Sequence, residues 1–164
     1  MLIFSLLGIL VSTIVILLNS KVLKIDQNTV KKITLKATIL CFFLSIFLWI
    51  FFDKSCVEYQ FIWKVYFFGG SFLENYIGVL FFGVDGISLF FILLSTFLIP
   101  LCLLTSYKLY YIKVREYCLY FLFLELFLIF SFTAMDLISF FIFFESILIP
   151  MFFIIGVWGS RERR

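Results

Sequence analysis

The sequence predicts an all-α membrane protein of about five transmembrane helices, with one extramembrane loop that resembles a β-hairpin. Hydrophobic residues make up 65% of the chain and charged residues only 14%, whereas soluble domains contain roughly half and a quarter. The mean hydropathy is +1.21, and the apolar residues gather in runs long enough to cross a bilayer. A polytopic membrane protein follows, and a soluble enzyme with a compact core is excluded.

Five apolar runs are interpreted as spans of a single membrane domain, residues 1–164. The first begins directly after Met1 and has neither the basic start of a secretory signal nor the arginines of a transit peptide, so we expect it to remain in the protein. The second is long enough if residues 33–36 form its first turn and a lysine snorkels to the interface. The predicted spans are residues 2–18, 34–52, 86–107, 117–134 and 137–158.

Residues 53–85 are rich in aromatic side chains but carry too many charges for a span. Two β-prone runs, residues 57–66 and 76–84, flank a segment that contains Gly69 and Gly70. We expect a surface β-hairpin that packs on the helix ends. A re-entrant segment is the alternative, and irregular backbone at that depth would have to be covered by protein.

Lysine and arginine are distributed unevenly between the two sides of the predicted bundle. The connectors after the first and third spans and the C-terminal tail hold most of the 13 basic residues, whereas the opposite side holds only Lys54 and Lys64. By the positive-inside rule, the three basic segments face the cytoplasm or matrix and the N-terminus faces outward. Five spans then place the C-terminus inside, in agreement with the charges.

Metal and haem sites are not expected in this chain. Histidine is absent, and the four cysteines are widely separated, with no C-x-x-C pair among them. Zinc, haem and iron–sulfur centres depend on such ligands.

The run from Asp136 to Trp158 carries one carboxylic acid, Glu145, near its middle, and Pro150 follows shortly after. A charged side chain at the centre of a span costs a few kcal/mol and usually marks a proton or ion pathway. Pro150 has no N–H and its ring clashes with the carbonyl of Ser146, so a backbone acceptor is freed beside the acid. We predict that Glu145 belongs to a proton pathway. The alternative is a neutral glutamic acid bonded to a neighbouring helix, with the proline a simple kink.

A second acid, Glu125, lies at the centre of the fourth span. Glu125 and Glu145 lie eleven residues before and nine residues after Asp136, so at about 1.5 Å per residue they reach similar depth on antiparallel neighbours. If they face each other, one holds a proton, because two carboxylates do not both ionise in a low dielectric. If they face apart, each needs another partner, and a cross-helix hydrogen bond that serves packing is the plainer interpretation of Glu125.

Neither acid has a predicted cationic partner within this chain. No lysine or arginine lies deep within a predicted span, so an ionised Glu145 requires a cation from elsewhere. Asp85 and Asp136, at the starts of the third and fifth spans, are explained as N-caps. The helical face around Glu145 is otherwise apolar and consists of Ile138, Phe141, Ile142, Leu148, Ile149 and Phe152.

Two strings in the second half resemble a known family. They are GVDGISLFFILLSTFLIPLCLLTS and MDLISFFIFFESILIPMFFIIGVWGSRERR. Both are similar to chain 4 of the proton-pumping NADH:ubiquinone oxidoreductase, respiratory complex I, which belongs to the antiporter-like subunits. The specific resemblance runs from about Gly83 to Arg164, and the residues before it agree only in layout, as two helices followed by an extracytoplasmic hairpin loop.

The resemblance implies a fourteen-helix proton-translocating subunit of an enzyme whose redox chemistry lies elsewhere. Glu145 matches the fifth-helix glutamate that the family pairs with a lysine on a broken seventh helix, Pro150 matches a proline of the same helix, and Glu125 is a candidate proton partner. NAD, FMN, iron–sulfur clusters and ubiquinone are expected in other subunits, and neither a cofactor nor nucleic acid is expected on this chain. The implied location is the mitochondrial inner membrane, with the N-terminus toward the intermembrane space and the C-terminus toward the matrix.

The sequence departs from the family because it ends after the fifth predicted helix, so the seventh-helix lysine is missing. We expect a split gene, in which a second polypeptide supplies the missing helices and a lysine near Glu145; an incomplete remnant is the alternative. The other expected partners are complex I membrane subunits and the lipid bilayer. Two alternative functions are a structural scaffold subunit without a proton path and a free-standing small ion transporter.

Overall fold

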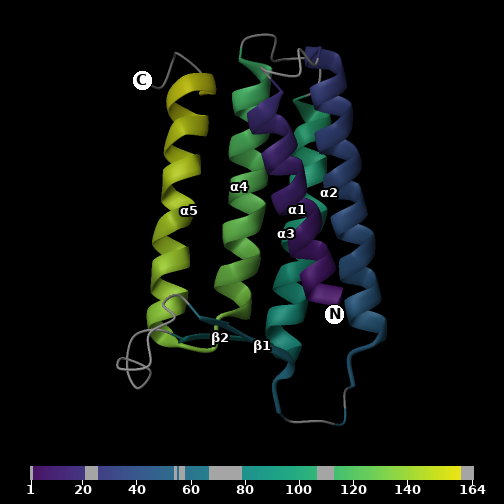
Figure 1. Ribbon diagram of the computed structural model, residues 1–164, viewed down its shortest axis with the longest axis vertical. Helices are drawn as coiled ribbons and strands as arrows, with labels where there is room; N and C mark the ends of the chain where they lie inside the picture. Colours follow the sequence, from purple (N-terminus) through teal and green to yellow (C-terminus); the bar gives the residue numbers. More distant parts are fainter. Residues whose placement is uncertain are drawn as a thin grey trace.

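The computed structural model describes residues 2–20, 26–53, 55, 58–66, 79–106 and 113–159. Five helices stand side by side, and a two-stranded sheet lies across one end of them (Figure 1). The predicted fold class, an all-α membrane protein with a hairpin, is confirmed. The elements are α1 (Leu2–Asn19), α2 (Gln27–Ile50), β1 (Gln60–Tyr66), β2 (Val79–Val84), α3 (Gly86–Thr105), α4 (Val114–Thr133) and α5 (Leu137–Trp158).

Four of these helices, α2 to α5, are long and apolar enough to cross a membrane. In α1 the apolar stretch Ile3–Asn19 is shorter, at the lower end of the length that spans a bilayer. It contacts α2 and α4 within the bundle, and its crossing of the membrane stays a prediction.

The boundaries of α5 agree with the prediction, but α2 begins earlier than expected. The predicted second span starts at residue 34, whereas the helix starts at Gln27, after the N-cap Asp26, whose carboxylate accepts the Gln27 N–H at 2.8 Å. Lys31 and Lys32 therefore lie on the helix and not in a connector. A capped start and residues of good helix propensity carry the helix beyond the apolar core. Helix α4 also begins earlier than predicted, by a smaller margin, at Val114 and not at residue 117.

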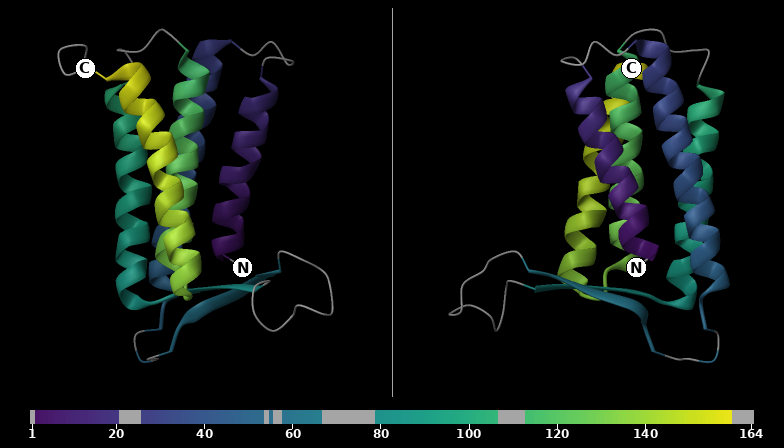
Figure 2. Two further views of the ribbon diagram at one scale, coloured as in Figure 1. Left: turned by 90° about the vertical axis from the view of Figure 1, so that its left-hand side faces the viewer. Right: turned by 45° about the vertical axis from the view of Figure 1, so that its right-hand side comes forward.

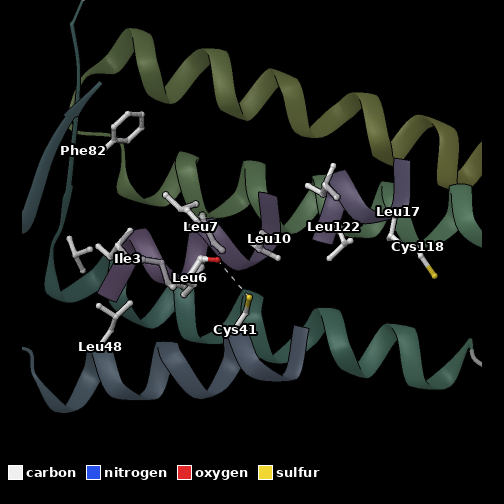
Figure 3. Close-up of a cluster of buried hydrophobic side chains, with 14 of the residues drawn as sticks. Ile3, Leu6, Leu7, Leu10, Leu17, Cys41, Leu48, Phe82, Cys118 and Leu122 are labelled. Carbon is white, nitrogen blue, oxygen red and sulfur yellow. Dashed lines mark hydrogen bonds between the residues drawn. The ribbon is translucent and has the colours of Figure 1, made fainter. Parts of the chain in front are cut away.

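Helices α1 to α4 form the packed bundle, whereas α5 contacts only α4 extensively. Buried leucines of α1 meet Leu48 of α2 and Leu122 of α4 (Figure 3). The thiol of Cys41 on α2 donates to the carbonyl of Leu6 on α1 at 3.9 Å. Because lipid tails are as apolar as leucine, such contacts stabilise the bundle through close packing more than through exclusion of water.

The two strands pair antiparallel, with Trp63 opposite Phe82 and an irregularity between Gln60 and Trp63. Phe61 sits within that irregularity with φ of 53°, as the extra residue of a bulge can. The sheet crosses the helix ends and does not enter the bundle (Figure 2), so the hairpin interpretation is confirmed over the re-entrant one for the described residues. The predicted turn with Gly69 and Gly70 lies outside them.

An aromatic cluster joins the hairpin to the helices. Phe82 is 1% exposed, stacks on Trp63 with ring centroids 5.1 Å apart, and meets Phe130 of α4 at 5.4 Å and Phe143 of α5 at 5.8 Å. The Met135 N–H, in the α4–α5 link, donates to the Phe81 carbonyl at 3.0 Å. The hairpin is therefore bonded to the junction of the last two helices.

Asp136 has a different role from the predicted N-cap. It occupies the cap position of α5, but its side chain makes no cap hydrogen bond. Its Oδ2 accepts the backbone N–H of Phe81 at 3.1 Å. Asp85, in contrast, caps α3 as predicted, in a capping box with Ser88.

Replacing Asp136 with alanine is expected to lower the free energy of unfolding by about 1–3 kcal/mol, because the half-buried Phe81 N–H loses a charged acceptor. The Asp136→Asn variant keeps an amide oxygen for that N–H and is expected to lose less. Thermal unfolding in detergent measures both. Equal losses in the two variants would show that the charge, and not the acceptor geometry, holds the strand.

Candidate functional site

Glu145 lies on the outer face of α5. Its side chain is exposed, and the inward face of the helix holds Ser139 and Pro150, both buried. The six apolar neighbours that the sequence placed around Glu145 are all exposed as well. The predicted apolar face with one acid is therefore present, and no element within the described part of the chain covers it.

Pro150 lies inside α5 without ending the helix. Because proline has no N–H, the carbonyl of Ser146 loses its helical hydrogen bond. The hydroxyl of Ser146 donates one turn back, to the carbonyl of Ile142 at 2.7 Å. A backbone acceptor is thus available next to Glu145 in sequence, while the proline ring itself packs inward against the bundle.

Glu125 lies in the interior of the bundle and is 0% exposed. It shares one face of α4 with Cys118, Leu122 and Ile129, at the spacing of a buried helical stripe, and those three residues belong to the core of the bundle. The same core contains Cys41 of α2. Neither carboxyl oxygen of Glu125 has a hydrogen-bond partner among the described residues.

The structure does not bring the two acids together, although α4 and α5 are antiparallel neighbours as predicted. Helix α4 meets α5 through other positions: Tyr120 stacks on Phe153 at 5.0 Å, and Phe130 stacks on Phe143 at 4.8 Å. Glu125 is fully buried on the α4 stripe that joins the core with α1 and α2, while Glu145 is exposed on the outer face of α5. Of the two predicted arrangements, the structure has the one in which the acids face apart, and a further partner for each acid stays a prediction.

Charged partners for the acids are absent from the described part of the spans. The one ion pair there joins Lys113 and Glu116 at 3.8 Å, on the surface at the start of α4. No group of histidine, cysteine and acidic side chains suited to a metal ion occurs among the residues that were placed. The chemistry that this arrangement supports is therefore proton binding by isolated carboxyl groups.

Sequence reasoning missed a row of polar side chains on the buried face of α2. Thr34, Thr38, Cys41 and Ser45 are each at most 1% exposed, and the Ser45 hydroxyl bonds to that of Thr96 on α3 at 2.9 Å. Their spacing of four, three and four residues is readable in the sequence as one helical stripe. A span that is predicted only from the length of its apolar run does not show such a stripe.

The helical fold and the two acids, Glu125 on α4 and Glu145 on α5, define the class of protein. It is a polytopic helical membrane protein with carboxyl groups inside its spans. The chain belongs to the NADH-ubiquinone oxidoreductase chain 4 family. Residues 34–135 match the family described as "NADH-ubiquinone oxidoreductase chain 4, amino terminus". Residues 134–164 match "NADH:quinone oxidoreductase/Mrp antiporter, TM". The family likeness thus reaches back to residue 34, well before the motifs that carried the resemblance in the sequence.

Curated relatives support the same assignment. NADH-ubiquinone oxidoreductase chain 4 of Prototheca wickerhamii is 44% identical over 147 residues, 84% of this chain and 28% of the relative. The same chain of Marchantia polymorpha is 40% identical over 152 residues, which cover 90% of this chain and 30% of the relative. NADH-quinone oxidoreductase subunit M of Rickettsia typhi is 38% identical over 134 residues, which cover 82% of this chain and 26% of the relative. The chain therefore spans under a third of the length of these relatives.

Proposed function

We propose that this chain is a proton-translocating membrane-arm subunit of NADH:ubiquinone oxidoreductase, in the mitochondrial inner membrane, and that Glu145 carries protons within it. The observation that carries the proposal is Glu145 itself, an acid on an otherwise apolar outer face with no cation beside it. An acid in the hydrocarbon region is costly and is kept where it serves a proton or ion path. The family supplies the reaction: chain 4 is part of an oxidoreductase that reduces quinone.

Glu145 acts in this proposal by binding and releasing one proton. A cation brought beside the carboxyl stabilises its ionised form, and removal of that cation favours the protonated form. Pro150 contributes by weakening the helix at the same level, because the Ser146 carbonyl lacks its helical partner. That carbonyl offers an acceptor for a water molecule or an incoming ammonium group, one peptide away from the acid.

The cation has to come from outside residues 1–164, since no lysine or arginine lies deep in the predicted spans. The exposed face of α5 is the surface that further helices would cover, and the lengths of the relatives leave room for them. We propose that these helices bring a lysine near Glu145. Apart from Lys64 on β1, the described basic residues lie at the opposite end from the hairpin, and the chain is proposed to place that basic end in the matrix.

Purification in mild detergent tests the proposal. We expect the chain to elute in a large particle together with other complex I subunits. Cross-linking from a Glu145→Cys variant to a lysine outside residues 1–164, with Glu116→Cys as the control on an outer position, would locate the cation. A small, monodisperse particle without such partners would contradict the proposal and favour a free-standing transporter.

A further inference from the structure

We propose that Glu125 is a second proton-binding group, separate from Glu145, which exchanges its proton with the basic end of the bundle along the polar row of α2. The inference goes beyond the proposed role of Glu145 and does not require it. The exchange is balanced: the carboxyl gives its O–H proton to the row and takes another from it. Glu125 therefore stays neutral on average, and no net charge moves.

Glu125 is fully buried, and neither of its carboxyl oxygens is hydrogen-bonded within the described structure. Leucine or methionine would fill the same position on the stripe of α4 without the cost of burying a polar group unpaired. An acid that served packing through a cross-helix hydrogen bond would show that bond. Packing thus explains the neighbours of Glu125 but not the carboxyl.

The polar row of α2 consists of side chains that lie about one helical turn apart on a single buried face. They are Thr34, Thr38, Cys41 and Ser45. Cys41, in the middle of the row, shares one core with Cys118, Leu122 and Ile129 of the α4 stripe that carries Glu125, and α2 and α4 are in contact. Each hydroxyl donates to its own helix, at 2.9 Å for Thr34, 3.1 Å for Thr38 and 2.7 Å for Ser45. A hydroxyl that donates in this way still offers acceptor lone pairs, so it can receive a proton as it releases its own.

The basic end of the bundle supplies the entrance. A cavity of about 20 Å³ lies there between α2, α3 and α4, which is room for one water molecule. Lys31, Ser106 and Cys118 are among the residues that line it. Lys31 and Leu35, which line the cavity, flank Thr34 in the sequence of α2, and Cys118 belongs to the same α4 stripe as Glu125, so the cavity adjoins the basic end of the polar row. Figure 3 shows Cys118 toward the end of the bundle away from Phe82, with Cys41 between them.

The hairpin end of the row is packed with large apolar side chains. Beyond Ser45 and its partner Thr96, Leu48 follows on α2, and Phe82 and Trp63 stack under it. All three of these apolar side chains are at most 6% exposed. We therefore expect proton exchange with Glu125 from the basic end, where the cavity lies.

Infrared difference spectroscopy of the intact complex that contains this chain tests the proposal. A protonated carboxylic acid has a carbonyl stretching band that shifts in D₂O once its proton has exchanged. We expect such a band to vanish in Glu125→Gln and to persist in Glu145→Gln. Glu125→Asp keeps an acid and should move the band, which provides the assignment even where the glutamine variant fails to assemble.

The route is tested separately by the rate of deuterium exchange. Thr38→Val keeps the shape of the side chain and removes one hydroxyl of the row, and should slow exchange at Glu125 by about tenfold. Thr133→Val is the matched control: Thr133 is equally buried and donates to its own helix at 2.8 Å, but lies at the hairpin end. No band that depends on Glu125, or equal exchange in both valine variants, would overturn the proposal. Neither result alters the pumping expected of Glu145.

Discussion

Replacing Glu145 with glutamine is expected to lower proton pumping by at least about tenfold, which corresponds to about 1.4 kcal/mol, while the complex still assembles. Glutamine has nearly the shape of glutamic acid, but its amide neither ionises nor releases a proton at neutral pH. The position is exposed on α5, so the folded chain loses no packing contact. The ratio of protons pumped to NADH oxidised, measured in proteoliposomes, is the appropriate observable.

Two further variants make the result interpretable. Glu145→Asp retains a carboxyl on a side chain one methylene shorter and should pump at an intermediate rate. Glu116→Gln removes an acid at the start of α4, where it pairs with Lys113 on the surface, and should leave pumping unchanged. Normal pumping by an assembled Glu145→Gln complex would instead favour a scaffold subunit without its own proton path.

Replacing Phe82 with alanine is expected to lower the free energy of unfolding by about 3–5 kcal/mol, the range found for large aromatic residues truncated in a packed interior. Phe82 is the contact between three elements, since its ring meets Trp63 on β1, Phe130 on α4 and Phe143 on α5. The cavity left behind would separate the hairpin from the helices. Thermal unfolding followed by tryptophan fluorescence suits the measurement, because Trp63 loses its stacking partner.

The adjacent residue Phe81 is the control for this prediction. It lies on the same strand but is only half-buried, and its ring meets the ammonium group of Lys64 at 4.9 Å. A cation–π contact at such a site contributes about 0.5–1 kcal/mol, so Phe81→Ala should have a small effect. Similar losses in the two variants would show that the hairpin responds to strand composition and not to the aromatic cluster.

The course of the chain was predictable where the sequence marks its ends chemically. The run from Leu137 to Trp158 stands between Asp136 and Gly159 and became α5 without a shift. The start of α2 was missed because lysines on a helix extending past the bilayer look like a connector, although Asp26 carries the cap signal. The bond from the Phe81 N–H to Asp136 joins residues far apart in the chain, and no local pattern encodes it.

The positions of the two acids were also predictable only in part. Their predicted depth rests on counting residues along two antiparallel helices, and the apolar surroundings of Glu145 followed from helical spacing. Which face of α4 meets α5 did not follow, because leucine and phenylalanine surround that helix and leave no polar side to orient it. The separation of Glu125 from Glu145 therefore needed the packing of α4 against α1, α2 and α3.

The outer face of α5 also bears on how these residues can be prepared. Where nothing covers that face, Glu145 meets lipid tails, at a cost of a few kcal/mol for a charged side chain. Stable preparation of these residues therefore depends on what covers the outer face of α5.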